Sequence, residues 1–314
     1  MRKRTKIGLG VLGSGMLAAS YYFYEMAIAT NPKPFLSNNR DLSDEMVRLM
    51  QPGQTWIKEQ PLELIEVTAH DGLTLRGHYL PPLVPSERVV ILVHGYGGVG
   101  TDLAGFAYLY HQAGFHVMMP DNRGHGKSDG NYIGFGWHDR EDCLRWSEYL
   151  IARLGQESTI FLHGVSMGGA TVLMTSGEKL PSQIKGIISD CAYTSVNAVL
   201  AYQMKRMYRL PHFPFLAMTS ILTKLKAGYF FSEASAIKQV RRATVPILFL
   251  HGGADTFVPT SMVYELYEAC PTEKELVVIP NAAHAMAYFE DPDTYDDVVE
   301  QFVRRILNEQ PKEV

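Results

Sequence analysis

The feature that most constrains the fold is a series of short apolar runs that alternate with longer amphipathic stretches. The runs are rich in β-branched residues and end in turn residues, as expected of strands buried on both faces. The stretches between them are long enough for crossover helices. The alternation predicts an α/β fold with a mostly parallel sheet and helices on both faces. The apolar runs are 88–95, 115–121, 159–164, 184–190, 245–252 and 275–280, and the predicted helices are 101–113, 137–154, 167–179, 259–270 and 292–308.

Two alternating runs precede this series. Residues 63–69 and 73–80 are separated by His70-Asp71-Gly72, which predicts a β-hairpin. The composition, with 46% hydrophobic and 20% charged residues, is that of a globular protein and argues against disorder and a polytopic membrane protein. A net charge of −4 gives no basic excess for nucleic acid binding. Three cysteines cannot form a disulfide framework.

The amino terminus has the pattern of a membrane-targeting element. Arg2, Lys3, Arg4 and Lys6 precede an uncharged run over residues 7–24. About 20 helical residues cross a bilayer. The basic cluster predicts a cytoplasmic amino terminus, so residues 1–30 are expected to form a membrane anchor that leaves an extracytoplasmic catalytic domain. The alternatives are a cleaved signal, with secretion after cleavage near Ala29, and a buried amphipathic helix of the soluble domain.

The rest of the chain divides into two parts. Residues 31–61 form a linker and lead-in that begins with Asn31-Pro32-Lys33-Pro34, which stops any helix. Residues 62–314 form the catalytic domain. Within it, the connection between the runs at 184–190 and 245–252 is longer than a crossover helix requires, and it is rich in methionine and aromatic residues. Connections of this length tend to be functional, so about 193–240 is interpreted as a cap insertion over the site.

The most specific motif is Gly164-Val165-Ser166-Met167-Gly168, directly after a predicted strand and directly before a predicted helix. Small residues two positions before and after a serine allow the tight turn on which its hydroxyl projects. The helix that follows places a positive dipole end near a developing negative charge. A glycine-rich strand-to-helix turn without catalytic function is the simpler alternative, but the context favours Ser166 as a nucleophile.

A serine nucleophile needs a base and a carboxylate that orients it. His284 and Asp255 each lie just beyond a predicted strand's carboxyl end, where open α/β sheets bind their ligands. Asp190, at the end of the run 184–190, is an alternative acid. Other histidines at turns are interpreted as structural, because a buried ring can bond loop carbonyls; they are His94, His125, His163 and His251.

Two other site types are excluded by residue pattern. Gly126-Lys127-Ser128 ends like a phosphate-binding loop, but the first glycine of that motif falls on Asp121, an acid where phosphate would approach. A metal site is not expected, because there is no HExxH motif or close Cys/His cluster. No cofactor is implied by any motif.

These motifs together resemble the α/β-hydrolase fold serine hydrolases over about four fifths of the chain. The chain is most similar to their single-domain esterase and peptidase-like group. The resemblance rests on His94-Gly95-Tyr96-Gly97-Gly98, the turn from Asp121 to Ser128, the serine turn and the chain order Ser, Asp, His. It implies a triad of Ser166, Asp255 and His284, with an oxyanion hole from the backbone N–H groups of Tyr96 and Met167.

The function expected from the sequence is hydrolysis of carboxylic esters through an acyl-enzyme. The partner is a small-molecule ester, and the apolar insertion favours an apolar acyl group. Amide or peptide cleavage by the same triad is one alternative, and a non-catalytic binding module of the same fold is another. A dehalogenase or epoxide hydrolase would require aspartate at position 166.

Overall fold

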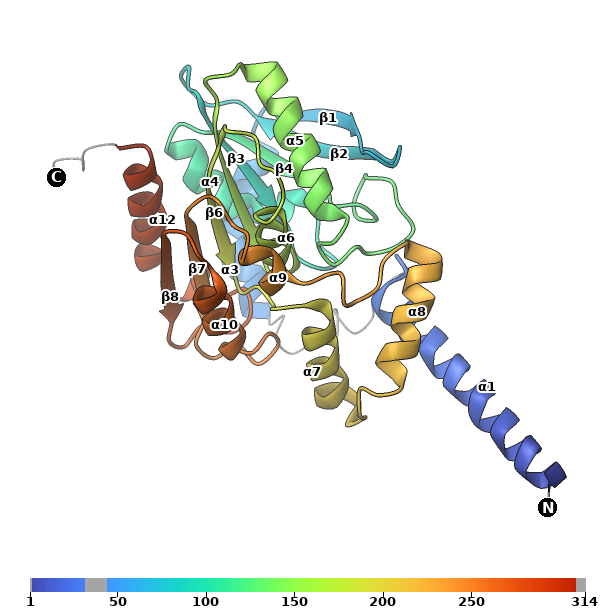
Figure 1. Ribbon diagram of the computed structural model, residues 1–314. Coiled ribbons are helices and arrows are strands. Elements are labelled where there is room, and N and C mark those ends of the chain that lie inside the picture. The colour runs from blue at the N-terminus through green and yellow to red at the C-terminus, as the bar shows by residue number, and fades with distance from the viewer. Residues whose placement is uncertain (1, 32–43, 309–314) are drawn as a thin grey trace.

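A computed structural model describes the backbone of residues 2–31 and 44–308, and the side chains of residues 15–31 and 48–308. In these ranges the chain forms one eight-stranded sheet with helices on both faces (Figure 1). The predicted α/β architecture is therefore confirmed. The strands are β1 (Glu63–Thr68), β2 (Thr74–Leu80), β3 (Arg88–Val93), β4 (His116–Pro120), β5 (Thr159–Val165), β6 (Ile184–Asp190), β7 (Ile247–Gly252) and β8 (Lys274–Ile279).

The strand order is β1-β2-β4-β3-β5-β6-β7-β8. β1 and β2 form the predicted hairpin, and β2 pairs antiparallel with β4, whereas all other neighbours are parallel. β4 lies on one side of β3 and β5 on the other, so the chain reverses its direction of winding between β3 and β5. Open sheets bind ligands at the carboxyl ends of strands that flank such a switch point. The topology therefore points to the loops after β3 and β5.

The helices cover both faces of the sheet. The five predicted crossover helices each begin within two residues of an observed helix. The described helical elements are α1 (Arg2–Ala27), α3 (Asp44–Lys58), η1 (Gly100–Leu103), α4 (Ala104–Gln112), α5 (Asp139–Leu154), α6 (Met167–Thr175), α7 (Val196–Tyr208), α8 (Phe215–Ala227), α9 (Ala236–Val240), α10 (Ser261–Ala269), α11 (Ala287–Glu290) and α12 (Pro292–Ile306).

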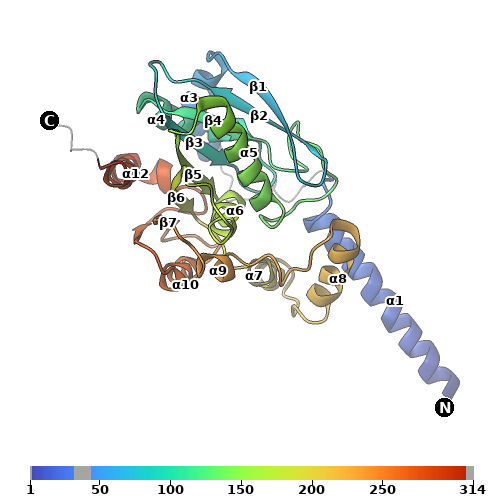
Figure 2. The same cartoon turned by 45° about the horizontal axis from the view of Figure 1, so that its top comes forward.

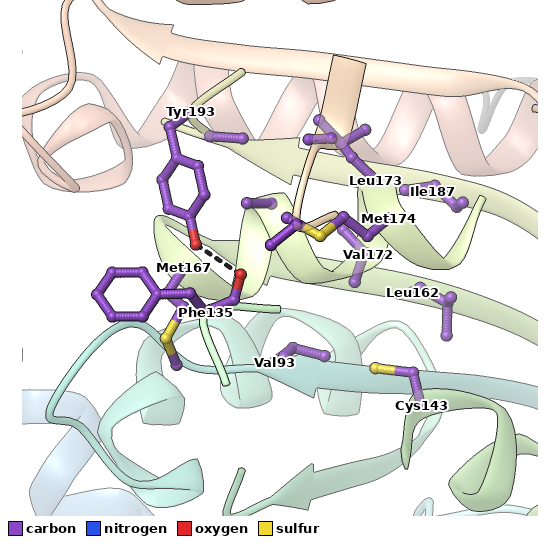
Figure 3. Close-up of a cluster of buried hydrophobic side chains, with 14 of the residues drawn as sticks. Val93, Phe135, Cys143, Leu162, Met167, Val172, Leu173, Met174, Ile187 and Tyr193 are labelled. Carbon is purple, nitrogen blue, oxygen red and sulfur yellow. Dashed lines mark hydrogen bonds between the residues drawn. The ribbon is translucent and has the colours of Figure 1, made fainter. Parts of the chain in front are cut away.

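Two hydrophobic clusters lie on opposite faces of the sheet. In β3, Val89, Ile91 and Val93 join the cluster under α5, α6, α9 and α10, while Val90 and Leu92 join the cluster under α3, α4, α11 and α12. This period of two, with both faces buried, explains why the strand is a continuous apolar run rather than an alternating one. Figure 3 shows part of the first cluster, with side chains from α6 between those of the strands and those of the loops.

The amino-terminal segment differs from its predicted role. In the described part of the chain, none of the helices has the length and apolar character needed to span a bilayer. The predicted membrane anchor, and the extracytoplasmic placement that depended on it, are therefore wrong. The side chains of residues 1–14, with the basic cluster, lie outside the described residues, as does the backbone of 32–43, with the predicted helix stop.

The physical reason for this correction is visible in the second half of α1. Glu25 and Ser20 interrupt the apolar character there, and they have partners in the helix and in the body: the Ser20 hydroxyl donates to the Met16 carbonyl at 2.8 Å, and Lys226 of α8 lies 3.8 Å from the Glu25 carboxylate. Tyr24 is buried against the folded domain. This half of α1 is thus a packing element beside α8 (Figure 2).

Candidate active site

Ser166 occupies the tight turn between β5 and α6. Its φ is 57°, in the left-handed region that a residue with a side chain rarely adopts and that costs roughly 1–3 kcal/mol. Gly164 and Gly168 make the turn possible, because a Cβ on either would collide with the backbone carbonyl of Gly168 or Val93, respectively. The Ser166 N–H donates to the carbonyl of Asp190 at 2.8 Å. The turn thereby holds the serine at the carboxyl end of β5.

A chain of hydrogen bonds leads from Ser166 into the protein. Ser166 Oγ lies 2.8 Å from His284 Nε2, and His284 Nδ1 lies 2.7 Å from Asp255 Oδ2. His284 is on the loop after β8 and Asp255 on the loop after β7. With a proton on Nδ1, the ring donates to the carboxylate and accepts from the serine hydroxyl. The structure therefore brings together the three residues that the sequence analysis selected.

The surroundings of Asp255 favour its ionised form. Burial alone would raise the pKa of this carboxyl, but hydrogen bonds from His251 and His284 outweigh it and hold the pKa well below its usual range. The backbone N–H groups of Phe257 and Val258 each donate to Oδ1 at 2.8 Å. Donors that favour the charged form stabilise a carboxylate in a buried position. The Asp255 side chain is fully buried, whereas 14% of the His284 side chain is exposed.

His251 is a site residue whose role the sequence analysis missed. It was interpreted as structural, yet its Nε2 lies 3.2 Å from Asp255 Oδ2 and 2.9 Å from the Val258 carbonyl. The spacing of four residues between His251 and Asp255 across a turn was the available signal. His94, His125 and His163 do bond loops and neighbouring side chains, as predicted for structural histidines.

Asp190, the alternative acid, lies in a different environment. Its Oδ2 accepts a hydrogen bond from the Tyr295 hydroxyl at 3.1 Å, and its Oδ1 has no hydrogen-bond partner among the described residues. Burial raises the pKa of Asp190. A carboxyl with few donors in a buried position favours its neutral form. Asp255 is therefore better suited than Asp190 to hold a charge next to His284.

The loop after β3 lies against the serine. A Cβ placed on Gly95 would be 3.5 Å from Ser166 Cβ and 4.0 Å from its Oγ, so the Gly95–Tyr96 backbone borders the hydroxyl. His94 braces this loop: its Nδ1 lies 2.7 Å from the Gly95 carbonyl and its Nε2 accepts from the N–H of Asn122 at 2.9 Å. Burial lowers the pKa of His94 to about 3, so the ring stays neutral. The other residue predicted for an oxyanion hole, Met167, is the first of α6.

An apolar cavity of about 120 Å³ opens beside Ser166. No charged side chain lines it. Its walls come from the loops after β3, β5 and β7, from α7 and α8, and from α1. Figure 3 shows Phe135, Met167 and Tyr193 of this lining close together, with the Tyr193 hydroxyl bonded to the Phe135 carbonyl at 2.9 Å. The lining is Phe23, Met26, Ala27, Tyr96, Phe135, Ser166, Met167, Tyr193, Val199, Leu200, Gln203, Met204, Met207, Tyr208, Leu216, Thr219, Phe257 and Val258.

The α1 residues of this lining were also missed. Phe23, Met26 and Ala27 belong to the aromatic and apolar run that the sequence analysis assigned to a membrane segment. The same run satisfies the pattern of an amphipathic helix, which was the least favoured alternative. A second cavity, of about 510 Å³, shares Tyr96 with the first and is lined by Val165 and Ala285, the neighbours of Ser166 and His284 in the chain.

A metal ion fits this site poorly. Among the described residues, ligand atoms of Cys191, Asp255 and His284 lie within 4.8 Å of one another. The nitrogen and the oxygen nearest each other, however, are joined by the hydrogen bond between His284 and Asp255. Burial raises the pKa of the Cys191 thiol well above its usual value. A metal requires the thiolate, which this environment disfavours.

Comparison with known families places this geometry. A family model described as the alpha/beta hydrolase fold matches residues 88–213, which include β3 to β6 and the Ser166 turn. The chain has the α/β-hydrolase fold. A second family model, described as serine aminopeptidase S33, matches residues 222–292 of this α/β-hydrolase.

Individual proteins resemble this α/β-hydrolase at low identity. The uncharacterized protein YqkD of Bacillus subtilis is 26% identical over 306 residues, which cover 96% of this chain and 97% of YqkD. A thermostable monoacylglycerol lipase from a Bacillus strain is 25% identical over 244 residues, covering 68% of this chain and 90% of the lipase.

Solved structures share the fold. An esterase from Pyrococcus furiosus superposes with a TM-score of 0.65 at 24% identity, covering 78% of this chain and 91% of the esterase. The acylaminoacyl peptidase of Pyrococcus horikoshii gives a TM-score of 0.60 at 17% identity, covering 83% of this chain and 44% of the peptidase. Because an esterase and a peptidase both match at such identities, the fold alone does not choose between ester and amide substrates.

Proposed function

We propose that this α/β-hydrolase is a serine hydrolase that cleaves carboxylic esters through an acyl-enzyme. The observation that carries the proposal is the hydrogen-bonded chain Ser166–His284–Asp255 on a strained turn at the switch point of the sheet. A buried carboxylate, an imidazole and a serine hydroxyl in this order are the parts that convert a weak nucleophile into an effective one.

In the first half of the reaction, Ser166 Oγ forms a bond to the ester carbonyl carbon while its proton passes to His284 Nε2. The resulting imidazolium lies 2.7 Å from the Asp255 carboxylate. Asp255 remains ionised because its hydrogen bonds hold its pKa low. The carboxylate thus orients the ring and stabilises the positive charge without accepting the proton.

The negative charge of the tetrahedral intermediate falls on the former carbonyl oxygen. The backbone N–H groups of Met167 and Tyr96 are the donors proposed to bind it, since both residues border Ser166. One such donor contributes on the order of 3 kcal/mol to transition-state stabilisation. The intermediate collapses as His284 Nε2 returns the proton to the leaving alkoxide oxygen. Water then repeats the sequence on the acyl-enzyme, and the carboxylic acid and free Ser166 are released.

The two cavities suggest how an ester would be held. The cavity beside Ser166 contains apolar and aromatic side chains and no charged one, so it suits a neutral hydrocarbon acyl group. Methionines in its lining, among them Met204 and Met207, adapt to chains of different shape. The second cavity borders Val165 and Ala285 and is the proposed position of the leaving alcohol.

Amide or peptide cleavage is the alternative reaction, and it is favoured by the match of residues 222–292 to the serine aminopeptidase family model. An aminopeptidase must bind a positively charged α-amino group on the acyl side. The acyl-side cavity has no carboxylate for that purpose. The lining therefore favours ester over aminopeptidase chemistry.

The test is turnover of p-nitrophenyl esters from acetate to palmitate, together with the matched p-nitroanilides, by the full chain. We expect ester hydrolysis that is lost in Ser166→Ala and retained in Ser182→Ala, an exposed serine outside the site. Hydrolysis of anilides alone would favour the amidase. No turnover and no reaction of Ser166 with a fluorophosphonate would favour a non-catalytic binding module.

A further inference from the structure

The carboxyl-terminal end of α1 is fixed to the body of the protein next to the candidate site. The Tyr96 hydroxyl donates to the Ala27 carbonyl at 2.9 Å. The Ile133 N–H donates to the Ile28 carbonyl at 2.6 Å, and Ala29 forms an antiparallel bridge with Tyr132. Ile28 is fully buried. Because Tyr96 belongs to the loop that borders Ser166, these bonds tie α1 directly to the loop beside the nucleophile.

The preceding turn of α1 packs on the helices that cover the site. The Phe23 ring lies edge-on to the rings of Tyr208 in α7 and Phe215 in α8, with centroids 5.5 and 6.1 Å away. The ammonium of Lys226 in α8 lies 4.7 Å from the centre of the Tyr24 ring. Aromatic pairs of this geometry contribute about 0.5–1.5 kcal/mol each beyond their buried area. Phe23 therefore has a defined position between α7 and α8.

Three side chains of α1 line the apolar cavity, and their order along the helix gives their depth. Figures 1 and 2 show α1 leading away from the body, with the amino terminus at its outer end and α8 beside its inner part. Met26 and Ala27 lie at the end tied to Tyr96, whereas Phe23 lies one turn farther out. The inner wall of the cavity is thus Met26 and Ala27, and Phe23 with Tyr208 closes its outer part.

We propose that the last turns of α1 select the acyl group, with Ala27 setting its width next to the nucleophile and Phe23 setting its length. This inference rests on the proposed esterase function and deepens it. The acyl groups it predicts are unbranched hydrocarbon chains that extend from Ser166 past Ala27 toward the Phe23 ring. The YqkD match covers 96% of the chain and so includes part of α1, which agrees with a role for this helix in the folded enzyme.

The experiment compares substitutions that change the cavity in opposite directions. Phe23→Ala removes the outer ring, so kcat/KM for laurate relative to butyrate should rise about tenfold, a typical effect of a few methylenes in an apolar pocket. Phe23→Leu should give a smaller shift in the same direction. Ala27→Met narrows the inner wall and should lower kcat/KM for octanoate about tenfold while acetate changes far less.

Tyr21→Ala is the matched control, because Tyr21 is an exposed aromatic residue of the same helix outside the cavity lining. Melting temperatures identify any variant that fails to fold. Variants of Phe23 and Ala27 whose chain-length profiles parallel that of Tyr21→Ala, in an enzyme that hydrolyses esters through Ser166, would overturn the acyl-selection role alone. Absence of Ser166-dependent ester hydrolysis in the unsubstituted chain would overturn the proposed function and, with it, this inference.

Discussion

The two walls of the candidate site are built from different materials. The wall formed by the sheet carries Ser166, His284 and Asp255 on loops whose backbone groups are bonded to one another and to the carboxylate. The wall formed by α1, α7 and α8 contacts the site mainly through apolar and aromatic side chains. Hydrogen bonds fix distances closely, whereas apolar contacts tolerate changes of shape. The difference suggests that the sheet determines the reaction and the helices determine the acyl group.

The largest effect should follow removal of the base. His284→Ala leaves Ser166 without a proton acceptor, so kcat should fall by about 10⁴- to 10⁶-fold while KM changes little. Steady-state kinetics with an octanoate ester measure it, and His70→Ala, an exposed histidine in the hairpin turn, is the control. A loss of less than tenfold in His284→Ala would contradict the assignment of the base.

The two buried acids should differ by orders of magnitude. Asp255→Asn keeps the shape but removes the charge beside His284, so kcat should fall about 10⁴-fold. Asp190→Asn, which changes a carboxyl bonded to Tyr295, should lower kcat less than tenfold. Measured kcat values for both variants decide the question. The reverse order would make Asp190 the triad acid.

Acidification should weaken the sheet-side wall. Burial lowers the pKa of His163 to about 3, so the folded protein keeps this ring neutral. The unfolded chain binds a proton below about pH 6.5, so stability is lost as pH falls from there toward 3, by about 2 kcal/mol at pH 5. Urea unfolding at pH 8 and pH 5 measures the loss. His163→Gln should lose about 2 kcal/mol less than the unsubstituted protein, and equal losses would contradict the prediction.

The smallest effect is expected on the helical wall. Met204→Ala shortens one side chain of the cavity lining without touching the triad, so KM for octanoate should rise about three- to tenfold at nearly constant kcat. Met218→Ala, in α8 outside the lining, is the control. A large fall in kcat for Met204→Ala would show that the two walls are not independent.

The same division explains what could be predicted from the sequence. Strand ends and the Ser166 turn follow from local rules, because buried strands and tight turns restrict which residues they accept. The contact of His251 with Asp255 depends on how one loop closes, which residue type does not reveal. The apolar run at Phe23 has the same composition in a membrane as against α7 and α8, so only tertiary packing distinguishes the two.

The central claim is that Ser166 is a nucleophile activated by His284 and Asp255. Its most direct test is mass spectrometry of the full chain after reaction with a fluorophosphonate. The account predicts one adduct on the peptide that contains Ser166, formed at least a hundredfold more slowly in His284→Ala, an order-of-magnitude estimate from triad variants, and absent in Ser166→Ala. An unlabelled Ser166, or labelling at the same rate without His284, would contradict it.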